Sequence, residues 1–589
     1  MATLVQLKHM ADKLRIHSLK STTAAGSGHP TSCLSCAEIV STLFFSEMKK
    51  DDEFILSKGH AAPILWAAYA EAGFIPVGEL MNLRKIDSVL EGHPTPRMSM
   101  IKVATGSLGQ GLSAGAGMAI ARRLKKSKAR VYVLLGDGEC AEGSVWEAAN
   151  AAAYYHLHNI CAIVDVNGLG QSQQTMHSHD AEAYKKKFEA FGWKAVVVGG
   201  HNIYELVKSL AKARKSSKPF AIIAKTFKGK GVSFLQSKEG WHGKALDKEQ
   251  LKKALIELGE ADIKLKSGIK KRIIRHSYIS FRLNKYKIGE EIATREAFGR
   301  ALLSLGRKNR KVVVLDGDVN NSTMTSYFFK RFHRRSFQSF IAEQNMAGMA
   351  IGLSSQGFIP FVATFGAFLT RAHDFIRMAD YSKANIKFVG SHSGVSIGED
   401  GPSQMGLEDL PMFLSIPKSA VLYPCDAVSA EHLVKELVKH KGISYLRTTR
   451  GKTPVIYGNN ERFPIGKFKV LRKSKKDRAL VIAAGITVFE ALKAYNALKR
   501  KRINIRVIDL YSVKPLDAEG LAKNARACGN NVIVVEDHYP NGIGGEVAKA
   551  VGKIKHLCIK ETPRSGKPAE LMGRYEIDSH AIIKAVNER

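Results

Sequence analysis

The residues best suited to chemistry lie in two short polar clusters, Gly136-Asp137-Gly138-Glu139 and Asn167-Gly168-Leu169. They offer an aspartate carboxylate, a side-chain amide and the carbonyls of a glycine-containing turn. These are hard oxygen ligands, but too few to fill the coordination sphere of a metal ion. Such a partial set suits a magnesium-type ion that completes its octahedron with phosphate oxygens. The clusters therefore predict a metal–diphosphate site, although a Gly-Asp-Gly triplet alone is more often an ordinary turn.

Both clusters follow apolar runs that predict buried strands, at 131–135 and 160–164. Between these runs, the alanine-rich segment 142–158 has the length of a helix. A strand–helix–strand pattern predicts neighbouring parallel strands with both clusters at their carboxyl ends. Open α/β sheets bind their ligands at that edge.

The bulk properties bound the class of protein. A chain of 589 residues exceeds one hydrophobic core and is expected to form about three domains. No apolar run approaches the ~20 residues that span a bilayer, so no membrane association is expected. Residues 1–20 predict an amphipathic helix; a transit peptide is the alternative, and Asp12 argues against it. We expect a cytoplasmic protein.

The seven cysteines form no disulfide framework and indicate free thiols in a reducing compartment. Cys33-Leu34-Ser35-Cys36 matches a redox pattern but follows no strand, so we expect both thiols to be packed in a helix.

The formal net charge is +36, and residues 264–287 hold nine lysines and arginines without an acid. No recognisable nucleic-acid-binding module accompanies this charge, so nucleic acid is not an expected partner. A solvated basic surface that attracts phosphorylated metabolites is the favoured interpretation.

Alternating strands and helices predict an α/β fold of three domains with mostly parallel sheets flanked by helices. The expected parts are residues 1–256, a basic linker at 257–287, a second domain at 288–455 that begins with a helix near Ala293, and a third at 465–589. Further strands are expected at 194–198, 221–224, 312–315, 361–363, 386–389, 479–483, 504–509 and 531–535.

Motifs along nearly the whole chain resemble those of the transketolase family of thiamine diphosphate-dependent enzymes. The spacing of Asp137 and Asn167 is similar to the thiamine diphosphate signature, and the other motifs are Gly26-Ser27-Gly28-His29-Pro30-Thr31-Ser32, Ser57-Lys58-Gly59-His60-Ala61, Ala104-Thr105-Gly106-Ser107-Leu108-Gly109-Gln110-Gly111, Trp241-His242-Gly243-Lys244, Ile341-Ala342-Glu343-Gln344-Asn345-Met346, Gly398-Glu399-Asp400-Gly401-Pro402-Ser403-Gln404 and Glu536-Asp537-His538. The resemblance implies a diphosphate-binding domain, a pyrimidine-binding domain and a C-terminal domain. It also implies a homodimer with each active site between the first domain of one subunit and the second of the other.

The resemblance further implies thiamine diphosphate and a divalent cation, Mg²⁺ or in its place Ca²⁺ or another metal. Asp137, Asn167 and the Leu169 carbonyl would hold the metal, which bridges the two phosphates. The implied cofactor contacts are Ser32, His60, Gly106, Ser107, Leu108, Gly138, Asn167, Lys228, His242, Phe368 and Gln404.

The implied catalytic residues are Glu343, His29 and His242. The family places a glutamate against the aminopyrimidine ring of the cofactor, where a partly apolar pocket keeps the carboxyl protonated. Phe365 and Phe368 follow Glu343 in sequence and are expected to provide that pocket.

Substrate contacts implied by the resemblance divide into phosphate and hydroxyl contacts. Arg295, Ser322 and Arg450 match phosphate-binding positions, which suit the planar fork of an arginine. The hydroxyls of the donor would be contacted by His29, His93 and His392, and its C2 hydroxyl by Asp400. His242 would also face the substrate.

Three positions depart from the family pattern, namely Gly168 in place of a larger basic residue, Gln404 in place of a histidine found in some members, and a shortened segment at Asp51-Asp52. Two segments imitate other sites. Asp316-Gly317-Asp318 resembles a metal-binding triplet, and Gly542-Ile543-Gly544-Gly545 resembles a dinucleotide loop without its full spacing. We expect both to be structural turns.

The resemblance implies transfer of a two-carbon ketol unit from a ketose phosphate, such as xylulose 5-phosphate, to an aldose phosphate, such as ribose 5-phosphate or erythrose 4-phosphate. Products would include sedoheptulose 7-phosphate and glyceraldehyde 3-phosphate, as in the pentose phosphate pathway. The alternatives are a related thiamine enzyme, such as a dihydroxyacetone or deoxyxylulose-phosphate synthase, and a non-catalytic nucleic-acid-binding relative.

Overall fold

The computed structural model of the chain describes residues 2–270 and 281–588. The chain forms two compact units, and short segments at 348–356 and 381–383 belong to the first, N-terminal unit. Met1 and residues 271–280 of the predicted linker lie outside the described residues. No helix among the described residues is long and apolar enough to cross a membrane.

The first unit is built on a five-stranded parallel sheet with the strand order β1-β2-β3-β5-β4. Its strands are β1 (Glu53–Leu56), β2 (Val131–Gly136), β3 (Ile160–Val166), β4 (Lys194–Gly199) and β5 (Phe220–Lys225). The four strands expected here are confirmed, and β1 is an addition. β2 and β3 are adjacent, so the two polar clusters lie at the same edge of the sheet.

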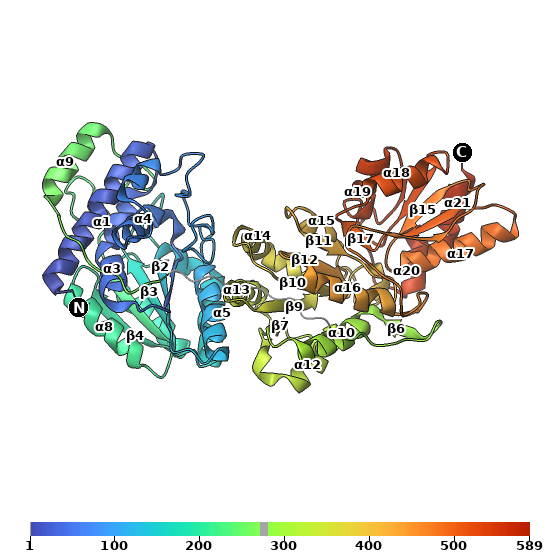
Figure 1. Cartoon of the computed structure of the whole chain (residues 1–589), viewed down its shortest axis with the longest axis horizontal. Helices are drawn as coiled ribbons and strands as arrows, with labels where there is room; N and C mark the ends of the chain where they lie inside the picture. Colours follow the sequence, from blue (N-terminus) through green and yellow to red (C-terminus); the bar gives the residue numbers. More distant parts are fainter. Residues whose placement is uncertain (1, 271–280, 589) are drawn as a thin grey trace. The chain divides into compact units, whose positions relative to one another are not determined.

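Helices cover both faces of this sheet because successive side chains of each strand point to opposite faces. Tyr132, Leu134 and Ile163 pack with the N-terminal helices and α8, whereas Val133 faces the glycine-rich α5. Figure 1 shows β2 and β3 between α3 and α5. The helices are α1 (Leu4–Ala25), α2 (Pro30–Ser35), α3 (Ala37–Thr42), α4 (Ala62–Glu71), α5 (Gly111–Leu124), α6 (Gly143–Tyr154), α7 (Ala181–Ala190), α8 (Ile203–Lys215) and α9 (Lys248–Leu258), with the short π-helix η1 (Leu43–Glu47) and the short 3-10 helices η2 (Gly59–Ala61), η3 (Val77–Asn82) and η4 (Gly138–Ala141).

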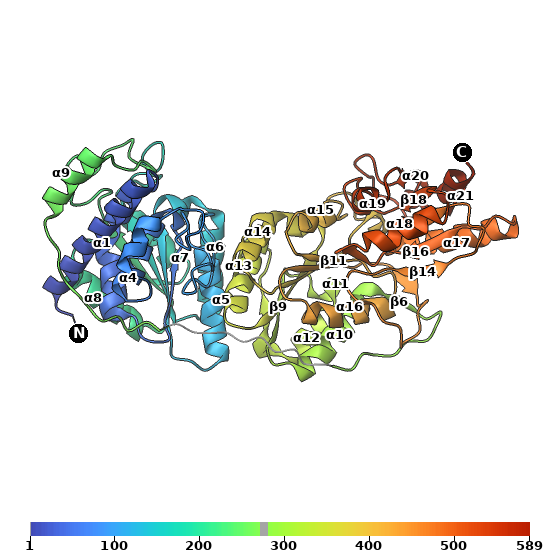
Figure 2. The same ribbon diagram turned by 45° about the horizontal axis from the view of Figure 1, so that its top comes forward.

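The second unit contains a seven-stranded sheet with the order β17-β11-β12-β10-β9-β7-β8, parallel except at β17. Its strands are β7 (Val312–Asp316), β8 (Ser336–Gln338), β9 (Ile359–Phe365), β10 (Lys387–Ser391), β11 (Ala420–Leu422), β12 (Ser444–Arg447) and β17 (Ser512–Lys514). The helices of this block are α10 (Thr294–Lys308), α11 (Asn320–Thr323), α12 (Ser326–Arg331), α14 (His373–Tyr381), α15 (Asp409–Leu414) and α16 (Ala427–Lys439), with η5 (His333–Arg335), η6 (Ala367–Ala372) and η7 (Val395–Ile397). α13 (Glu343–Ser355) begins in this block, and its residues from 348 on belong to the first unit. Figure 2 shows α10 and α16 side by side.

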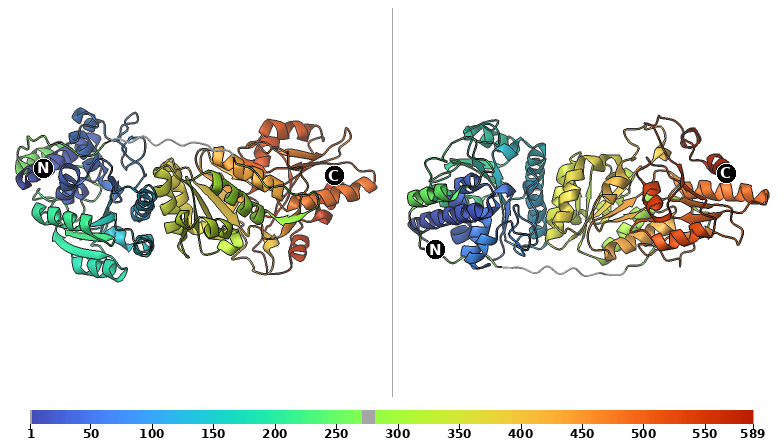
Figure 3. Two further views of the ribbon diagram at one scale, coloured as in Figure 1. Left: turned by 60° about the horizontal axis from the view of Figure 1, so that its bottom comes forward. Right: turned by 90° about the horizontal axis from the view of Figure 1, so that it is seen from above.

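The C-terminal part of the second unit has its own sheet, with the order β14-β16-β15-β18-β19, parallel except at β14. Its elements are β14 (Lys469–Arg472), β15 (Leu480–Ala483), β16 (Arg506–Asp509), β18 (Val532–Val535), β19 (Lys555–Leu557), α17 (Thr487–Arg500), α18 (Ala518–Arg526), α19 (Ile543–Val551), α20 (Pro568–Arg574) and α21 (Ser579–Asn587). α17 packs on α21 and α18 packs on α19, and Figure 3 shows further views of these helices around the orange and red strands. One apolar core joins the C-terminal block to the seven-stranded block.

Residues of the predicted linker from 281 on belong to the second unit. Tyr286 is buried, its hydroxyl donates to Glu431 on α16 at 2.6 Å, and the short strand β6 (Glu291–Ala293) pairs with β13 (Lys452–Pro454). Where the chain divides into domains stays a prediction. The fold class, an α/β fold with mostly parallel sheets flanked by helices, is confirmed.

Candidate active site

Asp137 lies directly after β2, and its carboxylate is held by the turn that follows β3. Its Oδ1 accepts the Gly138 N–H at 2.9 Å, and its Oδ2 accepts the Gly168 N–H at 2.7 Å and the Thr175 hydroxyl at 3.1 Å. Gly168 has a φ of 78°, and a Cβ there would lie 3.0 Å from the ring of His179. Both facts favour glycine at position 168 in this chain.

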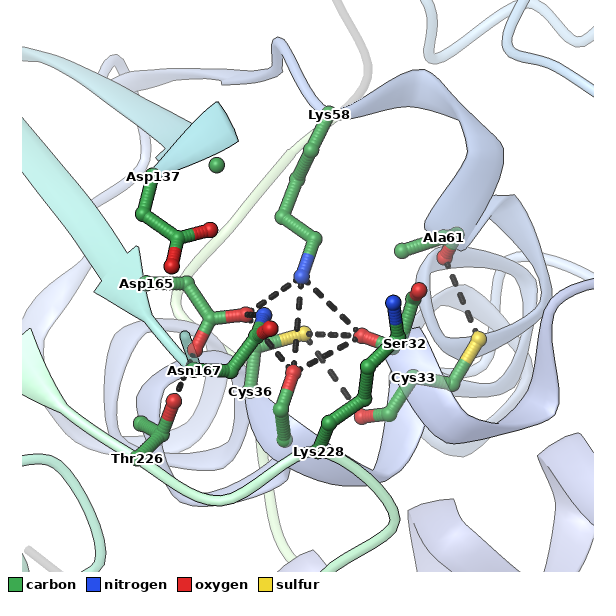
Figure 4. Close-up of polar contacts among 12 residues, drawn as sticks. Ser32, Cys33, Cys36, Lys58, Ala61, Asp137, Asp165, Asn167, Thr226 and Lys228 are labelled. Atoms are coloured by element: carbon green, nitrogen blue, oxygen red, sulfur yellow. Dashed lines mark hydrogen bonds and ion pairs between the residues drawn. The ribbon is translucent and has the colours of Figure 1, made fainter. Parts of the chain in front are cut away.

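Asn167 is oriented by its neighbour Asp165. The Asn167 Nδ2 donates to Asp165 Oδ2 at 3.2 Å, which directs the amide oxygen away from that carboxylate (Figure 4). In this conformation Oδ1 accepts the Leu169 N–H at 3.2 Å. The side-chain oxygen predicted to bind a metal therefore lies on the same turn as the Leu169 carbonyl.

A buried ion pair beside Asn167, formed by Lys58 and Asp165, was not part of the expected site. The Lys58 ammonium contacts Asp165 Oδ2 and also donates to the Ser32 carbonyl at 3.1 Å (Figure 4). Asp165 further accepts the hydroxyls of Ser35 and Thr226, each at 2.6 Å. Burial favours the neutral forms of the pair, but mutual attraction prevails, so the pKa of Lys58 is raised and that of Asp165 is lowered.

Lys228 places a positive charge on a predicted metal ligand. Its Nζ donates to the Leu169 and Gly170 carbonyls at 2.9 and 3.0 Å and lies 2.8 Å from His242 Nδ1. Burial and the nearby Lys58 ammonium lower the pKa of Lys228 to about 8. Because His242 Nδ1 accepts from this amine, we assign the proton of the neutral imidazole to Nε2.

Four histidines from separate loops cluster in the first unit. The ring centroid of His29 lies 5.2 Å from that of His60, 6.3 Å from His93 and 5.0 Å from His242. Burial is the main cause that lowers all four pKa values, to about 4 for His29 and His242. These imidazoles are therefore neutral near pH 7, and the buried Nδ1 of His29 has no hydrogen-bond partner within the described residues.

The glycine-rich loop with Gly106, Ser107 and Leu108 lies against the same cluster. Gly106 has a φ of 132°, and a Cβ there would lie 3.0 Å from His93. Glu139 fastens the loop, since its carboxylate accepts the Gly109 N–H at 2.8 Å, the Gly136 N–H at 3.0 Å and the Ser57 hydroxyl. The four histidines, the loop and the turn with the predicted metal ligands thus lie together in the first unit.

The second unit carries the other predicted residues. Glu343 is the first residue of α13 and is buried. At the end of β9, Phe365 stacks between Phe368 on η6, at a centroid distance of 5.0 Å, and His392, at 4.0 Å. The three rings are nearly parallel, and His392 directly follows β10.

Two arginines surround His392 with positive charge. Burial, Arg295 and Arg450 lower the pKa of His392 to about 3. Arg295 Nη1 donates to the Ser322 carbonyl at 2.8 Å, while its buried Nε has no partner in the described part of the chain. Arg450 Nη1 donates to the Ile397 carbonyl at 2.9 Å and lies 3.2 Å from Asp400. The structure therefore brings His392, Arg295, Ser322, Arg450 and Asp400 together.

Gln404 also belongs to the second unit. It lies in the turn after Gly401, and its buried Oε1 has no hydrogen-bond partner among the described residues.

The segments that imitate other sites are turns or packed side chains. Asp316 accepts the Val319 N–H and the hydroxyls of Thr323 and Thr325 at 2.7 to 2.8 Å, so its carboxylate closes a turn. Glu536 occupies the N–H groups at the start of α19 that a dinucleotide phosphate would need. Cys33 and Cys36 are buried free thiols in and just after α2, and burial raises both pKa values.

Family models cover most of the chain. Residues 6–278 match "Transketolase, thiamine diphosphate binding domain", residues 290–455 match "Transketolase, pyrimidine binding domain" and residues 466–582 match "Transketolase, C-terminal domain". The chain belongs to the transketolase family.

Similar curated proteins cover nearly the full length. Transketolase from Homo sapiens is 48% identical, with 99% of this chain and 97% of that protein aligned. Transketolase-like protein 1 from Bos taurus is 43% identical, over 99% of this chain and 96% of that protein. Transketolase from Campylobacter jejuni superposes with a TM-score of 0.88 over 99% of each chain; at 24% identity this similarity shows the fold alone.

The transketolase-type residues of the first unit fit a metal-bound diphosphate. Burial and the Asp165 carboxylate raise the pKa of Asp137, so its ionised form would be stabilised by an added cation. The position of the Lys228 amine shows that the Leu169 carbonyl is already oriented toward a positive charge.

Proposed function

We propose that the chain is a transketolase that transfers a two-carbon ketol unit from a ketose phosphate to an aldose phosphate. Xylulose 5-phosphate is the proposed donor, and ribose 5-phosphate or erythrose 4-phosphate is the proposed acceptor. With ribose 5-phosphate, the products are sedoheptulose 7-phosphate and glyceraldehyde 3-phosphate, which places the reaction in the pentose phosphate pathway.

The arrangement around His392 carries this proposal. Arg295 and Arg450 supply two guanidinium groups beside an imidazole that burial keeps neutral. Guanidinium groups bind phosphate, whereas a neutral imidazole exchanges hydrogen bonds with hydroxyls. A phosphorylated sugar presents both kinds of group on one short molecule.

The residues of the first unit would hold the cofactor. Asp137, Asn167 and the Leu169 carbonyl would bind Mg²⁺ or another divalent cation, which in turn would bind the diphosphate. When bound, thiamine diphosphate supplies the nucleophilic carbon and the electron sink for the two-carbon unit. Gly106, Ser107 and Leu108 would approach the cofactor through their backbone, and Glu343 would orient the pyrimidine ring by a carboxyl hydrogen bond.

The histidines of the first unit would exchange protons with substrate hydroxyls. His29 and His242 are neutral near pH 7 because burial lowers both pKa values to about 4. A neutral His29 can accept a hydroxyl proton, and His242 can donate its Nε2–H to a substrate oxygen.

A homodimer in the cytoplasm completes the proposal. Ile341 is 78% exposed two residues before the buried Glu343, and a partner subunit would cover such an apolar side chain beside the active site. All seven cysteines are free and buried, which suits a reducing compartment.

A coupled assay tests the proposed reaction. Xylulose 5-phosphate and ribose 5-phosphate are supplied with and without thiamine diphosphate and Mg²⁺, and glyceraldehyde 3-phosphate is measured. We expect product only with thiamine diphosphate, and loss of activity after chelation of the metal. Turnover with formaldehyde as acceptor, or with pyruvate plus glyceraldehyde 3-phosphate, would instead favour a related thiamine enzyme. Salt-dependent RNA binding without donor cleavage would favour the non-catalytic alternative.

Replacement of Glu343 tests the catalytic assignment. Glu343→Ala and the isosteric Glu343→Gln should each lower kcat by about 10²-fold or more, because general acid–base groups contribute about that much. The thermal melting temperature should stay close to that of the wild type. Glu431→Gln, which changes a buried glutamate on α16, is the matched control and should keep its turnover. Near-normal kcat in Glu343→Gln would refute the role.

A further inference from the structure

The sequence motif Glu536-Asp537-His538 has no role in the proposed reaction, yet its three side chains are fully buried. The motif directly follows β18 of the C-terminal block. Glu536 faces that block, where it caps α19 and contacts His556 at 2.5 Å. Asp537 and His538 face the seven-stranded block instead, and His538 Nε2 lies 3.2 Å from Asp409.

Asp537 takes part in a charged network that contains Arg447, the last residue of β12. Its Oδ1 accepts from Arg447 Nη1 and from the Tyr423 hydroxyl, each at 2.9 Å. Arg447 also donates to Asp409 Oδ2 and to the Gly406 carbonyl, both at 2.9 Å. The Arg447 guanidinium therefore joins the Asp537 carboxylate of the C-terminal block to the Asp409 carboxylate and the Gly406 carbonyl of the seven-stranded block.

The second oxygen of Asp537 lies against the backbone of Gly394. A Cβ at Gly394 would fall 1.8 Å from Asp537 Oδ2, and Gly394 has a φ of 85°. No side chain larger than hydrogen fits between this carboxylate and the turn. Oδ2 has no hydrogen-bond partner within the described residues, so its contact with Gly394 is one of close packing.

This turn carries His392, the histidine proposed to bind the donor. His392 itself has a left-handed φ of 55°, which is uncommon for a residue other than glycine. The turn is pinned on its other side, because the Gly394 N–H donates to the Gly406 carbonyl at 3.1 Å, the same carbonyl that accepts from Arg447. Asp537 thus packs directly on Gly394, and Arg447 donates to the carbonyl that binds the Gly394 N–H, two residues after the imidazole that stacks on Phe365.

We propose that Asp537 is a positioning residue for donor recognition, which acts from the C-terminal block through the turn 392–394 on the His392 imidazole. The inference rests on the proposed function, because it needs His392 to contact the ketose donor. It gives the C-terminal block a part in substrate recognition that reaches the site through one carboxylate.

The test compares donor kinetics of Asp537→Asn with those of the wild-type holoenzyme. The amide keeps the shape of the side chain but removes the negative charge that pairs with Arg447, which weakens the hold on Arg447 and, through the shared Gly406 carbonyl, on the turn. We expect the KM for xylulose 5-phosphate to rise about tenfold while kcat changes by less than about twofold, as for an interaction lost equally from the ground state and the transition state. Tyr423→Phe removes one donor to Asp537 without a change of shape and should raise the same KM by a smaller factor.

A double-mutant cycle separates positioning from general loss of structure. In a His392→Ala background, Asp537→Asn should raise the donor KM no further, because its effect passes through the missing imidazole. Equal effects in both backgrounds would overturn the proposal. Glu536→Gln, on the neighbouring carboxylate that faces the C-terminal block, is the matched control; it should lower thermal stability and leave the donor KM unchanged.

The failure of this inference is distinguishable from failure of the proposed function. If the wild type shows no ketol transfer, or if His392→Ala leaves the donor KM unchanged, the assignment of the donor site is wrong. If His392→Ala raises the donor KM and folded Asp537→Asn does not, only the positioning role is wrong. Should Asp537→Asn melt below the assay temperature, Tyr423→Phe in both backgrounds gives the same comparison.

Discussion

At the scale of single residues, a lysine with almost no exposed surface lies beside the proposed cofactor-binding residues. Lys58 and Asp165 are both buried, and each is the other's counter-ion. Transfer of two charges out of water is costly, and loss of one partner leaves the other uncompensated. The pair therefore contributes more to the orientation of nearby side chains than to the stability of the fold, since Asp165 also fixes the amide of Asn167.

Neutralising one member of this pair should be worse than neutralising both. Lys58→Met should lower the free energy of unfolding by about 3–5 kcal/mol, the usual effect of an uncompensated buried charge. The double variant Lys58→Met/Asp165→Asn should recover most of that loss. Denaturant titration measures both values, and titration calorimetry should show weaker thiamine diphosphate binding in each variant. Additive losses of stability would contradict this account of the pair.

At the scale of elements, long apolar runs made most of the sheet predictable. The runs at 131–135 and 160–164 form β2 and β3, and the polar residues that follow them lie at the predicted edge of the sheet. Short strands such as β11 and β17 were not predicted. Each has three residues, and β17 pairs with a strand far away in sequence, so neither has a local pattern that sets it apart from a loop.

The residues of the predicted site lie in two groups, one in each unit, and their roles stay predictions. Residues whose type and spacing suit a particular chemistry, such as Asp137 with Asn167 for metal binding, could be selected as candidates from the sequence. Lys58 stands in a recognised motif, but its partner Asp165 lies at the end of an apolar strand and carries no local signal. Ion pairs between distant segments depend on the tertiary fold, so the sequence pattern did not reveal this one.

The seam between the seven-stranded block and the C-terminal block holds a titratable carboxyl. Asp509 at the end of β16 accepts the Tyr457 hydroxyl at 2.7 Å and the Cys425 thiol at 3.2 Å, while its buried Oδ1 has no partner in the described residues. Burial, only partly offset by these bonds, raises the pKa of Asp509 to about 7. The folded protein therefore holds this proton over a pH range in which the unfolded chain releases it.

Asp509 should make the stability of the seam depend on pH. Between pH ~4 and pH ~7 the folded state binds more protons than the unfolded state, so stability falls as pH rises through this window. The loss from this residue should reach about 4 kcal/mol at most and level off above pH ~7. Asp509→Asn should remove this contribution, measured as the difference between the two proteins in urea titrations at each pH. An unchanged pH profile in the variant would show that Asp509 does not titrate here.

At the scale of the whole molecule, the net charge of +36 has no single local cause. The 90 lysines and arginines are distributed over both units and exceed the 54 aspartates and glutamates. Such a charge creates a long-range field that raises the local concentration of anions. Because the proposed substrates carry phosphate groups, the field should favour their binding before Arg295 or Arg450 makes contact.

This field predicts a salt dependence that follows substrate charge. Raising NaCl from about 20 mM to about 300 mM shortens the Debye length and should lower kcat/KM for xylulose 5-phosphate by about threefold or more. The uncharged ketose erythrulose, used as donor with glycolaldehyde as acceptor, should change by less than about 1.5-fold over the same range. The exposed lysines Lys473, Lys475 and Lys476 lie in a loop outside the proposed site, and their joint replacement by glutamate should reduce the salt effect only for the phosphorylated donor. If both donors respond equally to salt, the salt effect does not depend on substrate charge and the proposed attraction is wrong. If the triple variant keeps the full dependence, the attraction comes from the arginines of the site and not from the charge of the whole molecule.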